Sequence, residues 1–304
     1  MKKIGKFVKS NVKTVVAFIL GIVVAGGTVY AATLAASSVT FNKTNVTQYG
    51  ATKDNVQDAI AELYGKANDL SQYKEFLMDN FGGLPGTPTS FATDSWATIA
   101  YAVKTGNTSV YAPTPSNVAN PVLREVDLGT LGTHYLRVAN TTPCTTETSK
   151  SGCGFVIEFA DVITEMNFHS SKSANYGASD IQSYVNTFVY NKMPQELQKL
   201  IIPITLTYVR QSATLSLENQ KVYLLSLTEV IGTNTYDKAA DTTRQLDYYY
   251  YGGSRVKECT SQYWWSRSQY NSNLANTSVI GSSSSPYPGV NTSTYGVSPA
   301  FRIG

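Results

Sequence analysis

The longest apolar stretch of this chain lies near its start, at residues 14–36, and contains no charged side chain. About 20 apolar residues are enough to cross a bilayer as a helix. A positive segment followed by an apolar one is typical of an export signal that keeps its positive charges on the cytoplasmic side. The pattern therefore predicts that residues 1–36 enter a membrane and that everything after Ala36 is exported. The positive charges are Lys2, Lys3, Lys6, Lys9 and Lys13.

Two fates of this segment fit the sequence. Val29 and Ala31 are small residues at the −3 and −1 positions of a plausible signal-peptidase cut after Ala31. Without that cut the segment remains as an anchor, and the rest of the chain is extracellular. A buried helix in a soluble core is the least favoured interpretation. We expect a secreted or membrane-anchored protein.

Residues 37–89 predict a spacer, a stalk helix and a linker. Residues 37–50 are polar and extended, and a helix begins near Asp54 with Thr52 or Asp54 as N-cap. Its apolar positions follow steps of 4-3-4-3-7 and skip Lys74, which gives a heptad-like seam. Two interpretations remain open: self-association through residues 54–80, or packing against the chain's own domain. The seam positions are Val56, Ile60, Leu63, Ala67, Leu70 and Leu77.

From about Ser90 the apolar positions predict one domain of mixed helices and strands. Helical spacing predicts helices at residues 95–104 and 179–192, the second with a Ser179–Gln182 capping box, and a short helix after Pro194. Alternation and apolar runs predict strands, without the regular βαβ order of a parallel sheet. The fold class is therefore α+β over residues 90–304. The predicted strands are residues 122–128, 134–139, 154–163, 204–210, 222–227, 263–267 and 297–303.

The charge of the exported part excludes one class of partner. The whole chain has 24 Lys+Arg against 21 Asp+Glu, and without the five N-terminal lysines the balance is 19 against 21, or −2. Nucleic-acid binding thus has no electrostatic support. The same part is poor in charge and rich in Tyr, Thr, Ser and Asn, which suits contacts with neutral ligands.

The cysteines and histidines do not indicate a metal site. Cys144 and Cys153 enclose a short polar loop and are candidates for a disulfide in an oxidising compartment, the alternative being two free thiols. Cys259 is then left over. His134 and His169 are the two histidines, and there is no CxxC pair. We expect neither a metal nor a cofactor.

No catalytic motif is present in the sequence. It has no phosphate-binding glycine loop, no Gly-x-Ser-x-Gly and no His-Glu-x-x-His. Glu158 and Asp161 lie in an apolar run, where each is either a buried acid or a carboxylate satisfied by local contacts. His134 and His169 have no neighbouring acid and nucleophile. We therefore expect no catalysis.

The end of the chain carries the most specific motifs. Residues 263–268 are Tyr-Trp-Trp-Ser-Arg-Ser, and residues 296–302 are Gly-Val-Ser-Pro-Ala-Phe-Arg. The pair resembles the W-W-x-R-S and G-V-x-P-A-F-R signatures of an uncharacterised bacterial family, domain of unknown function 6273. Segments near residues 126–130, 180–186 and 222–226 also resemble that family, so the resemblance covers about residue 90 to the end. The signature positions are Trp264, Trp265, Arg267, Gly296, Pro299, Phe301 and Arg302.

This resemblance implies export or surface attachment and assigns no reaction. The closing motifs also resemble those of C-type-lectin-like folds, which include formylglycine-generating enzymes and variable display proteins. Fold alone does not determine function. The enzymes need a reactive cysteine arrangement near the end, where Cys259 has no partner in the sequence. The resemblance therefore favours a C-type-lectin-like domain that binds rather than catalyses.

The signature residues themselves have a simple structural interpretation. We expect Trp264, Trp265 and Phe301 in the core. Arg267 and Arg302 are expected to hold the two closing strands together through carboxylate or carbonyl contacts.

Between the two motifs, residues 269–295 contain no acid or base and are dense in Asn, Ser, Thr, Tyr and Gly. Tyr supplies contact area in adaptable binding surfaces, and the small polar residues supply hydrogen bonds. An ordinary polar surface loop is the alternative. Residues 248–251 are a second aromatic cluster, which either flanks the same surface or packs as part of a half-buried helix. The candidate ligand-binding residues are Tyr270, Asn271, Asn273, Asn276, Tyr287 and Asn291.

The sequence thus predicts an exported or cell-surface module that binds a neutral ligand such as a glycan or a peptide. One alternative is a structural stalk or tail-fibre-like assembly protein, because residues 55–60 resemble a module found in surface and phage tail fibres. A formylglycine-generating type of enzyme is the other.

Overall fold

The structure is a computed structural model that describes residues 56–142, 154–172, 174–210, 213–232, 245–270, 275–281 and 286–304. The predicted membrane segment, the spacer, Cys144, Cys153, Asn271 and Asn273 lie outside this part. Among the described residues, no helix combines the length and the apolar character that a membrane span requires. The chain divides into two compact units, residues 1–69 and residues 70–304.

Helix α2 (Val56–Phe81) is the predicted stalk helix, and its last turns belong to the second unit. There Leu77 is fully buried in the core, and Tyr73 packs against the same core. The Lys104 ammonium lies 5.3 Å from the centroid of the Tyr73 ring. Lys104 belongs to the next helix, α3 (Trp96–Thr105). The end of the seam thus packs on the chain's own domain, as one of the two interpretations expected.

Helix α3 confirms the helix predicted at residues 95–104, and its limits follow from local chemistry. The Ser95 hydroxyl caps its start by accepting a hydrogen bond from the Thr98 amide at 3.1 Å. Gly106 ends it at a φ of +73°, which glycine adopts without steric cost. Ile99 on its buried face is fully enclosed.

The first sheet has the strand order β1-β2-β3-β12-β7, and all its pairs are antiparallel. Its central strand β3 is buried along its whole length, which agrees with the apolar run predicted at residues 154–163. The predicted glycine hairpin joins β1 to β2, where the Leu128 amide donates to the Gly132 carbonyl at 2.9 Å. The strands are β1 (Arg124–Asp127), β2 (Thr133–Asn140), β3 (Phe155–Phe159), β7 (Val222–Leu224) and β12 (Pro299–Ile303).

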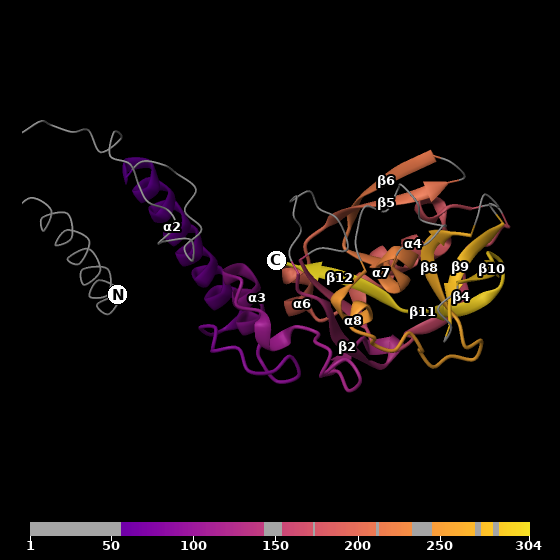
Figure 1. Cartoon of the computed structure of the whole chain (residues 1–304), viewed down its shortest axis with the longest axis horizontal. Coiled ribbons are helices and arrows are strands. Elements are labelled where there is room, and N and C mark those ends of the chain that lie inside the picture. The colour runs from indigo at the N-terminus through magenta and orange to yellow at the C-terminus, as the bar shows by residue number, and fades with distance from the viewer. Residues whose placement is uncertain are drawn as a thin grey trace, which may run out of the picture. The chain divides into compact units, whose positions relative to one another are not determined.

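The second sheet has the strand order β10-β9-β8-β11-β4 and lies at the opposite end of residues 70–304 from α3 (Figure 1). Three of its strands come from residues 276–297, a segment in which only Val297 carried a strand prediction. Its polarity hid them, because Thr277 and Ser278 are buried in β9 without an apolar alternation. The strands are β4 (Thr164–Asn167), β8 (Trp264–Gln269), β9 (Asn276–Ile280), β10 (Tyr287–Val290) and β11 (Thr294–Val297).

The chain crosses from the second sheet to the first at Ser298, between β11 and β12. Ser298 is fully buried, and its hydroxyl donates to the carbonyl of Phe159 at the end of β3 at 2.9 Å. This one residue therefore ties the last strand of each sheet to the central strand of the first.

Helices and a two-stranded hairpin complete the domain. The helix predicted at residues 179–192 is continuous but changes to a π-helix in its middle. Its capping box is only half formed, because Ser179 caps the Gln182 amide while the Gln182 side chain bonds to Gln220.

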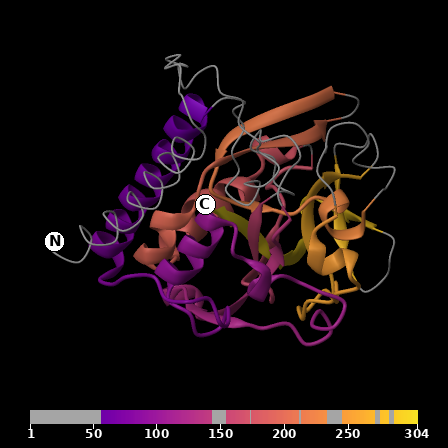
Figure 2. The same cartoon turned by 60° about the vertical axis from the view of Figure 1, so that its left-hand side comes forward.

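Helices α3 and α6 lie side by side (Figure 1, Figure 2). The remaining elements are α4 (Asp180–Ser183), the π-helix η6 (Tyr184–Val189), α5 (Tyr190–Lys192), α6 (Gln195–Leu200), β5 (Ile204–Arg210), β6 (Ala213–Gln220), α7 (Leu227–Ile231), α8 (Asp247–Tyr250) and the 3-10 turns η3 (Ser109–Tyr111), η4 (Gly129–Leu131) and η5 (Tyr176–Ala178). The fold is a mixed α+β arrangement with several sheets.

Candidate functional site

An open groove of about 360 Å³ lies beside β10, an edge strand of the second sheet. The loop between α8 and β8 forms most of it, and the first residue of β10 completes it. A volume of this size lies in the range of small-molecule sites. We name it the tyrosine groove, and its lining residues are Val256, Lys257, Glu258, Cys259, Gln262, Tyr263 and Tyr287.

Four aromatic rings lead from the tyrosine groove into the core. The Tyr287 and Tyr263 rings meet edge to face, with centroids 5.0 Å apart. Tyr263 contacts Tyr295, which in turn contacts Trp265 at 4.8 Å. Tyr287 is 41% exposed, whereas Trp265 is fully buried. The row therefore presents an aromatic surface to solvent that is anchored at its inner end.

Two glycines let these rings lie directly on the backbone. A Cβ at Gly281 would come within 2.7 Å of the Tyr263 ring, and one at Gly289 within 2.6 Å of the Trp265 ring. Any larger residue at either position would displace a ring. The glycines therefore fix where the row of rings lies.

Hydrogen bonds to β4 and within the loop itself hold the loop that forms the groove. The Thr260 amide donates to the Glu165 carboxylate on β4, and the Gln262 amide donates to the Cys259 carbonyl at 3.1 Å. The Ser261 hydroxyl donates to the Tyr263 carbonyl at 2.9 Å. These bonds fix the loop before any ligand arrives.

Gln262 adopts a left-handed backbone conformation with a φ of +61°. In the part of the chain that the structure describes, Asn219 is the one other non-glycine residue at positive φ. Asparagine tolerates this region better than glutamine does. Such residues cost on the order of 1 kcal/mol or more and cluster at ligand clamps. No pattern in the sequence predicts this conformation.

Beneath the groove, the Lys257 side chain is directed into the core and is fully buried. Its ammonium donates to the Glu158 carboxylate at 2.8 Å, and to the Phe159 carbonyl and the Ser298 hydroxyl at 2.6 Å each. Glu158 also accepts hydrogen bonds from Arg137 at 2.9 Å and from the Tyr249 hydroxyl at 2.8 Å. One buried carboxylate therefore serves two cations.

The electrostatics of this cluster follow from that shortage of negative charge. Burial alone would raise the pKa of the Glu158 carboxyl, but the charges of Arg137 and Lys257 hold it below its ordinary value. Burial and the positive charge of Arg137 lower the pKa of Lys257, and the attraction of Glu158 raises it. The net result is a pKa of about 8. Lys257 is thus the cation that gives up its proton first.

The two acids that the sequence singled out, Glu158 and Asp161, both have hydrogen-bond partners within the protein. Glu158 is the buried acid of the cluster around Lys257. Asp161 is satisfied by local contacts, because its carboxylate lies 2.7 Å from His134 Nδ1 and accepts a hydrogen bond from the Tyr135 amide at 3.1 Å. Neither acid lines the tyrosine groove.

The aromatic signature residues Trp264, Trp265 and Phe301 are fully buried, as expected for the core. Gly296 allows close packing, because a Cβ there would come within 2.8 Å of Val162. Pro299 is buried at the start of β12.

The two signature arginines differ in what they hold. Arg267 on β8 donates to the Leu224 carbonyl of β7 at 2.9 Å and to the Glu229 carboxylate of α7. These contacts are of the expected chemical kind, but they tie β8 to β7 and α7 rather than to the other closing strand. The Arg302 guanidinium lies against Gly154, where a Cβ would come within 2.8 Å of Nη2.

The candidate ligand-binding residues that the structure describes do not gather in one place. Tyr287 lines the tyrosine groove. Asn276 lies at the other end of the β9–β10 pair, opposite Val290, and its carbonyl accepts from the Tyr270 amide at 3.1 Å. Asn291 is fully buried, where its side-chain amide donates to the Lys172 carbonyl at 3.0 Å. The sequence did not single out Glu258, Gln262 or the position of Tyr263 in the groove.

The second aromatic cluster is divided between core and surface. Tyr248 and Tyr249 are buried and contact Arg137, whereas Tyr250 and Tyr251 are exposed. The cluster is therefore half-buried around a short helix, as one interpretation of residues 248–251 expected, and its position beside the polar surface stays a prediction.

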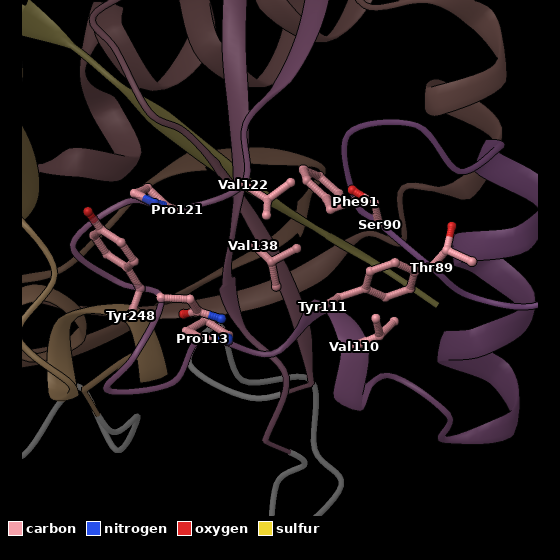
Figure 3. A pocket seen from close by; sticks show the side chains of 11 residues that line it. Thr89, Ser90, Phe91, Val110, Tyr111, Pro113, Pro121, Val122, Val138 and Tyr248 are labelled. Atoms are coloured by element: carbon pink, nitrogen blue, oxygen red, sulfur yellow. The ribbon is translucent and has the colours of Figure 1, made fainter.

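A smaller cavity of about 80 Å³ lies between η3, β2 and α8 (Figure 3). Figure 3 shows Val122 and Val138 between the Tyr248 ring on one side and Phe91 and Tyr111 on the other. The Tyr111 hydroxyl is bound to Asp94 at 2.6 Å, and the Tyr248 hydroxyl accepts from Arg137 at 3.2 Å. These internal bonds and its size make this cavity a weaker candidate than the tyrosine groove.

Comparison with known protein families adds one match. Residues 156–304 match the model of a family described as Domain of unknown function (DUF6273). The matched residues contain the tyrosine groove, both closing motifs and the cluster around Lys257 except for Arg137. The match begins inside β3, so α3, β1 and β2 precede it. No curated protein and no solved structure matches this chain.

Proposed function

We propose that this chain is an exported bacterial surface protein whose domain binds a neutral ligand, such as a glycan or a peptide, without catalysis. The observation that carries this proposal is the tyrosine groove, an open groove of about 360 Å³ flanked by two tyrosine rings. Rigid aromatic rings supply contact area at a low cost in conformational entropy.

The charges of the groove favour a ligand without negative charge. Two charged residues line it. The Lys257 ammonium is buried and is already bonded to the Glu158 carboxylate and the Ser298 hydroxyl, so it is not free to pair with a ligand. Glu258 is exposed and forms no ion pair with another described residue. An anionic ligand would therefore meet one carboxylate and no available cation.

The closing motifs extend the proposal to a fold family and a location. Their resemblance to C-type-lectin-like folds supports a display role, since ligand contacts in such proteins lie between these motifs. The lysines and the apolar run of residues 1–36 support export, either as a cleaved signal or as an anchor. In this proposal the stalk helix carries the binding domain away from the membrane.

A binding array tests the proposal. The full chain is applied to glycans, uncharged peptides and bacterial cell-wall fragments, beside the variants Tyr287→Ala and Tyr250→Ala. Tyr250 is the matched control, because it is an exposed tyrosine outside the tyrosine groove, 64% accessible. Loss of one ring that stacks on a nucleic-acid base costs about 1–3 kcal/mol, so by analogy we expect Tyr287→Ala to bind at least about fivefold more weakly and Tyr250→Ala to bind like the parent. Equal binding by all three proteins, or by none, would contradict the proposal.

A further inference from the structure

The strained glutamine in the tyrosine groove points to a narrower class of ligand. We propose that the groove holds a pyranose ring, with Tyr287 against its apolar face and with Glu258 and Gln262 bonded to its hydroxyl groups. This inference rests on the proposed function and names the ligand class of the same groove.

The backbone of Gln262 is the first step of the argument. Its φ of +61° is one that glycine or asparagine adopts more easily, yet the position carries a long amide side chain. The loop bonds at Thr260, Ser261 and the Gln262 amide maintain this conformation. Gln262 is exposed and lines the groove. Strain that the surrounding loop maintains at a groove indicates a function for that side chain.

The chemistry of the lining is the second step. A carboxylate such as Glu258 accepts short, strong hydrogen bonds from hydroxyl groups. The Gln262 amide both donates and accepts, so it fits a hydroxyl in either role. The face of the Tyr287 ring is negative and attracts the C–H bonds of a sugar's apolar face. Together these three groups match both sides of a pyranose ring.

The groove lacks what an extended peptide would need. A bound strand requires unpaired backbone groups along an edge. Here the amides of Thr260 and Gln262 and the carbonyl of Tyr263 are already bonded within the protein. The edge strand β10 also contains Pro288, which has no N–H to donate. The groove therefore favours a sugar over a peptide.

The test uses the full chain in detergent solution and a panel of methyl pyranosides and short oligosaccharides, with uncharged peptides and methylammonium salts as competing probes. Binding is followed by ligand-observed NMR and calorimetry. The variant Gln262→Gly removes the amide and relieves the backbone. Asn219→Gly is its matched control, because it relieves the other positive φ, at a residue outside the groove.

We expect both glycine variants to unfold at the same urea concentration as the parent or a higher one. Gln262→Gly is expected to bind sugar at least tenfold more weakly, and Asn219→Gly to bind like the parent. Gln262→Asn keeps an amide and tolerates the same φ, so it should bind more tightly than Gln262→Gly. Glu258→Gln is expected to weaken sugar binding several-fold.

Three results would overturn the inference. Sugar binding that is unchanged in Gln262→Gly would remove this residue from the site. Binding of peptides or methylammonium ions in place of sugars, lost in Tyr287→Ala, would keep the groove as a binding site and reject the sugar. No binding of any probe would reject the proposed function as well.

Discussion

At the scale of single residues, the carboxylate of Glu158 serves two buried cations. Fully buried, it pairs with Arg137 from β2 and with Lys257 beneath the groove. Removing one partner of a buried charge pair leaves an uncompensated charge and is strongly destabilising. With two cations on one carboxylate, the cluster already carries an excess positive charge. Lys257 is the cation that can remove this excess by losing a proton, because the Arg137 guanidinium stays protonated.

This excess predicts how stability depends on pH. Burial lowers the pKa of Lys257 to about 8 in the folded chain, from an ordinary value of 10.5. Between these values the unfolded chain binds a proton that the folded chain does not. The contribution of Lys257 to the free energy of unfolding therefore rises with pH across this window. We expect the parent to gain stability, relative to Lys257→Met, between pH 7 and about pH 9.5, measured by urea unfolding.

A lysine outside the cluster provides the control for this prediction. Lys172 is exposed, so Lys172→Met should follow the parent at both pH values. Measurements stay below pH 10 because burial raises the pKa values of Tyr176, Tyr223 and Tyr249, and these tyrosines oppose the trend at higher pH. Parallel pH profiles for the parent and Lys257→Met would contradict the assignment.

Gln262 shows where prediction at the residue scale ends. The sequence indicated correctly that Trp264, Trp265 and Phe301 belong to the core, because large apolar rings have few other stable places. A positive φ at a glutamine has no such signal. It arises from a turn bonded to β4, which is distant in sequence. Apart from Tyr287, which the composition of residues 269–295 singled out, the groove residues could therefore be recognised only after folding had brought the loop and β10 together.

At the scale of elements, periodicity predicted helices and half-buried strands well. The helix at residues 95–104 and the hairpin of β1 and β2 follow the helical and alternating patterns of their sequences. Strands β9 and β10 and all of β11 except Val297 were missed, because buried positions in them are occupied by Thr277, Ser278, Gly289 and Gly296. Such side chains are buried here through hydrogen bonds, for example between Thr277 and Asn291 at 2.9 Å. Hydrophobic patterns do not detect a strand of that kind.

The end of helix α2 gives a prediction at the same scale. Leu77 is fully buried in the core, whereas its neighbour Met78 is 46% exposed. Deleting a buried leucine side chain costs about 2–5 kcal/mol. We expect Leu77→Ala to lower the free energy of unfolding by about that amount. Met78→Ala should change it by less than about 1 kcal/mol, as surface substitutions do.

Urea unfolding of both variants checks whether the helix serves the domain or another molecule. Equal, small effects that depend on protein concentration would show that Leu77 packs in an oligomer. A large, concentration-independent effect confined to Leu77→Ala supports packing within the chain. In that case the apolar seam available to a second copy ends before Leu77.

At the scale of the whole molecule, the folded unit is larger than the family match. The match begins at residue 156, within β3. Strands β1 and β2 lie before it and extend the same sheet beyond β3, and Arg137 on β2 neutralises Glu158 on β3. The domain therefore needs residues that the family model does not include. The segment near residues 126–130, which resembles the family's opening strand, indicated this in the sequence, whereas the match does not include it.

A pair of fragments tests this dependence. In a fragment of residues 156–304, one edge of β3 loses its hydrogen-bonded neighbour, and the fully buried Val156 and Ile157 lose part of their cover. Glu158 loses Arg137 and keeps Lys257 alone. Together these losses are comparable with the whole stability of a small domain, which is about 5–15 kcal/mol. We expect this fragment to aggregate or to show no cooperative urea transition, and a fragment of residues 70–304 to unfold cooperatively. Cooperative unfolding of the shorter fragment, with circular dichroism typical of a folded α+β protein, would show instead that β1 and β2 only decorate an independent core.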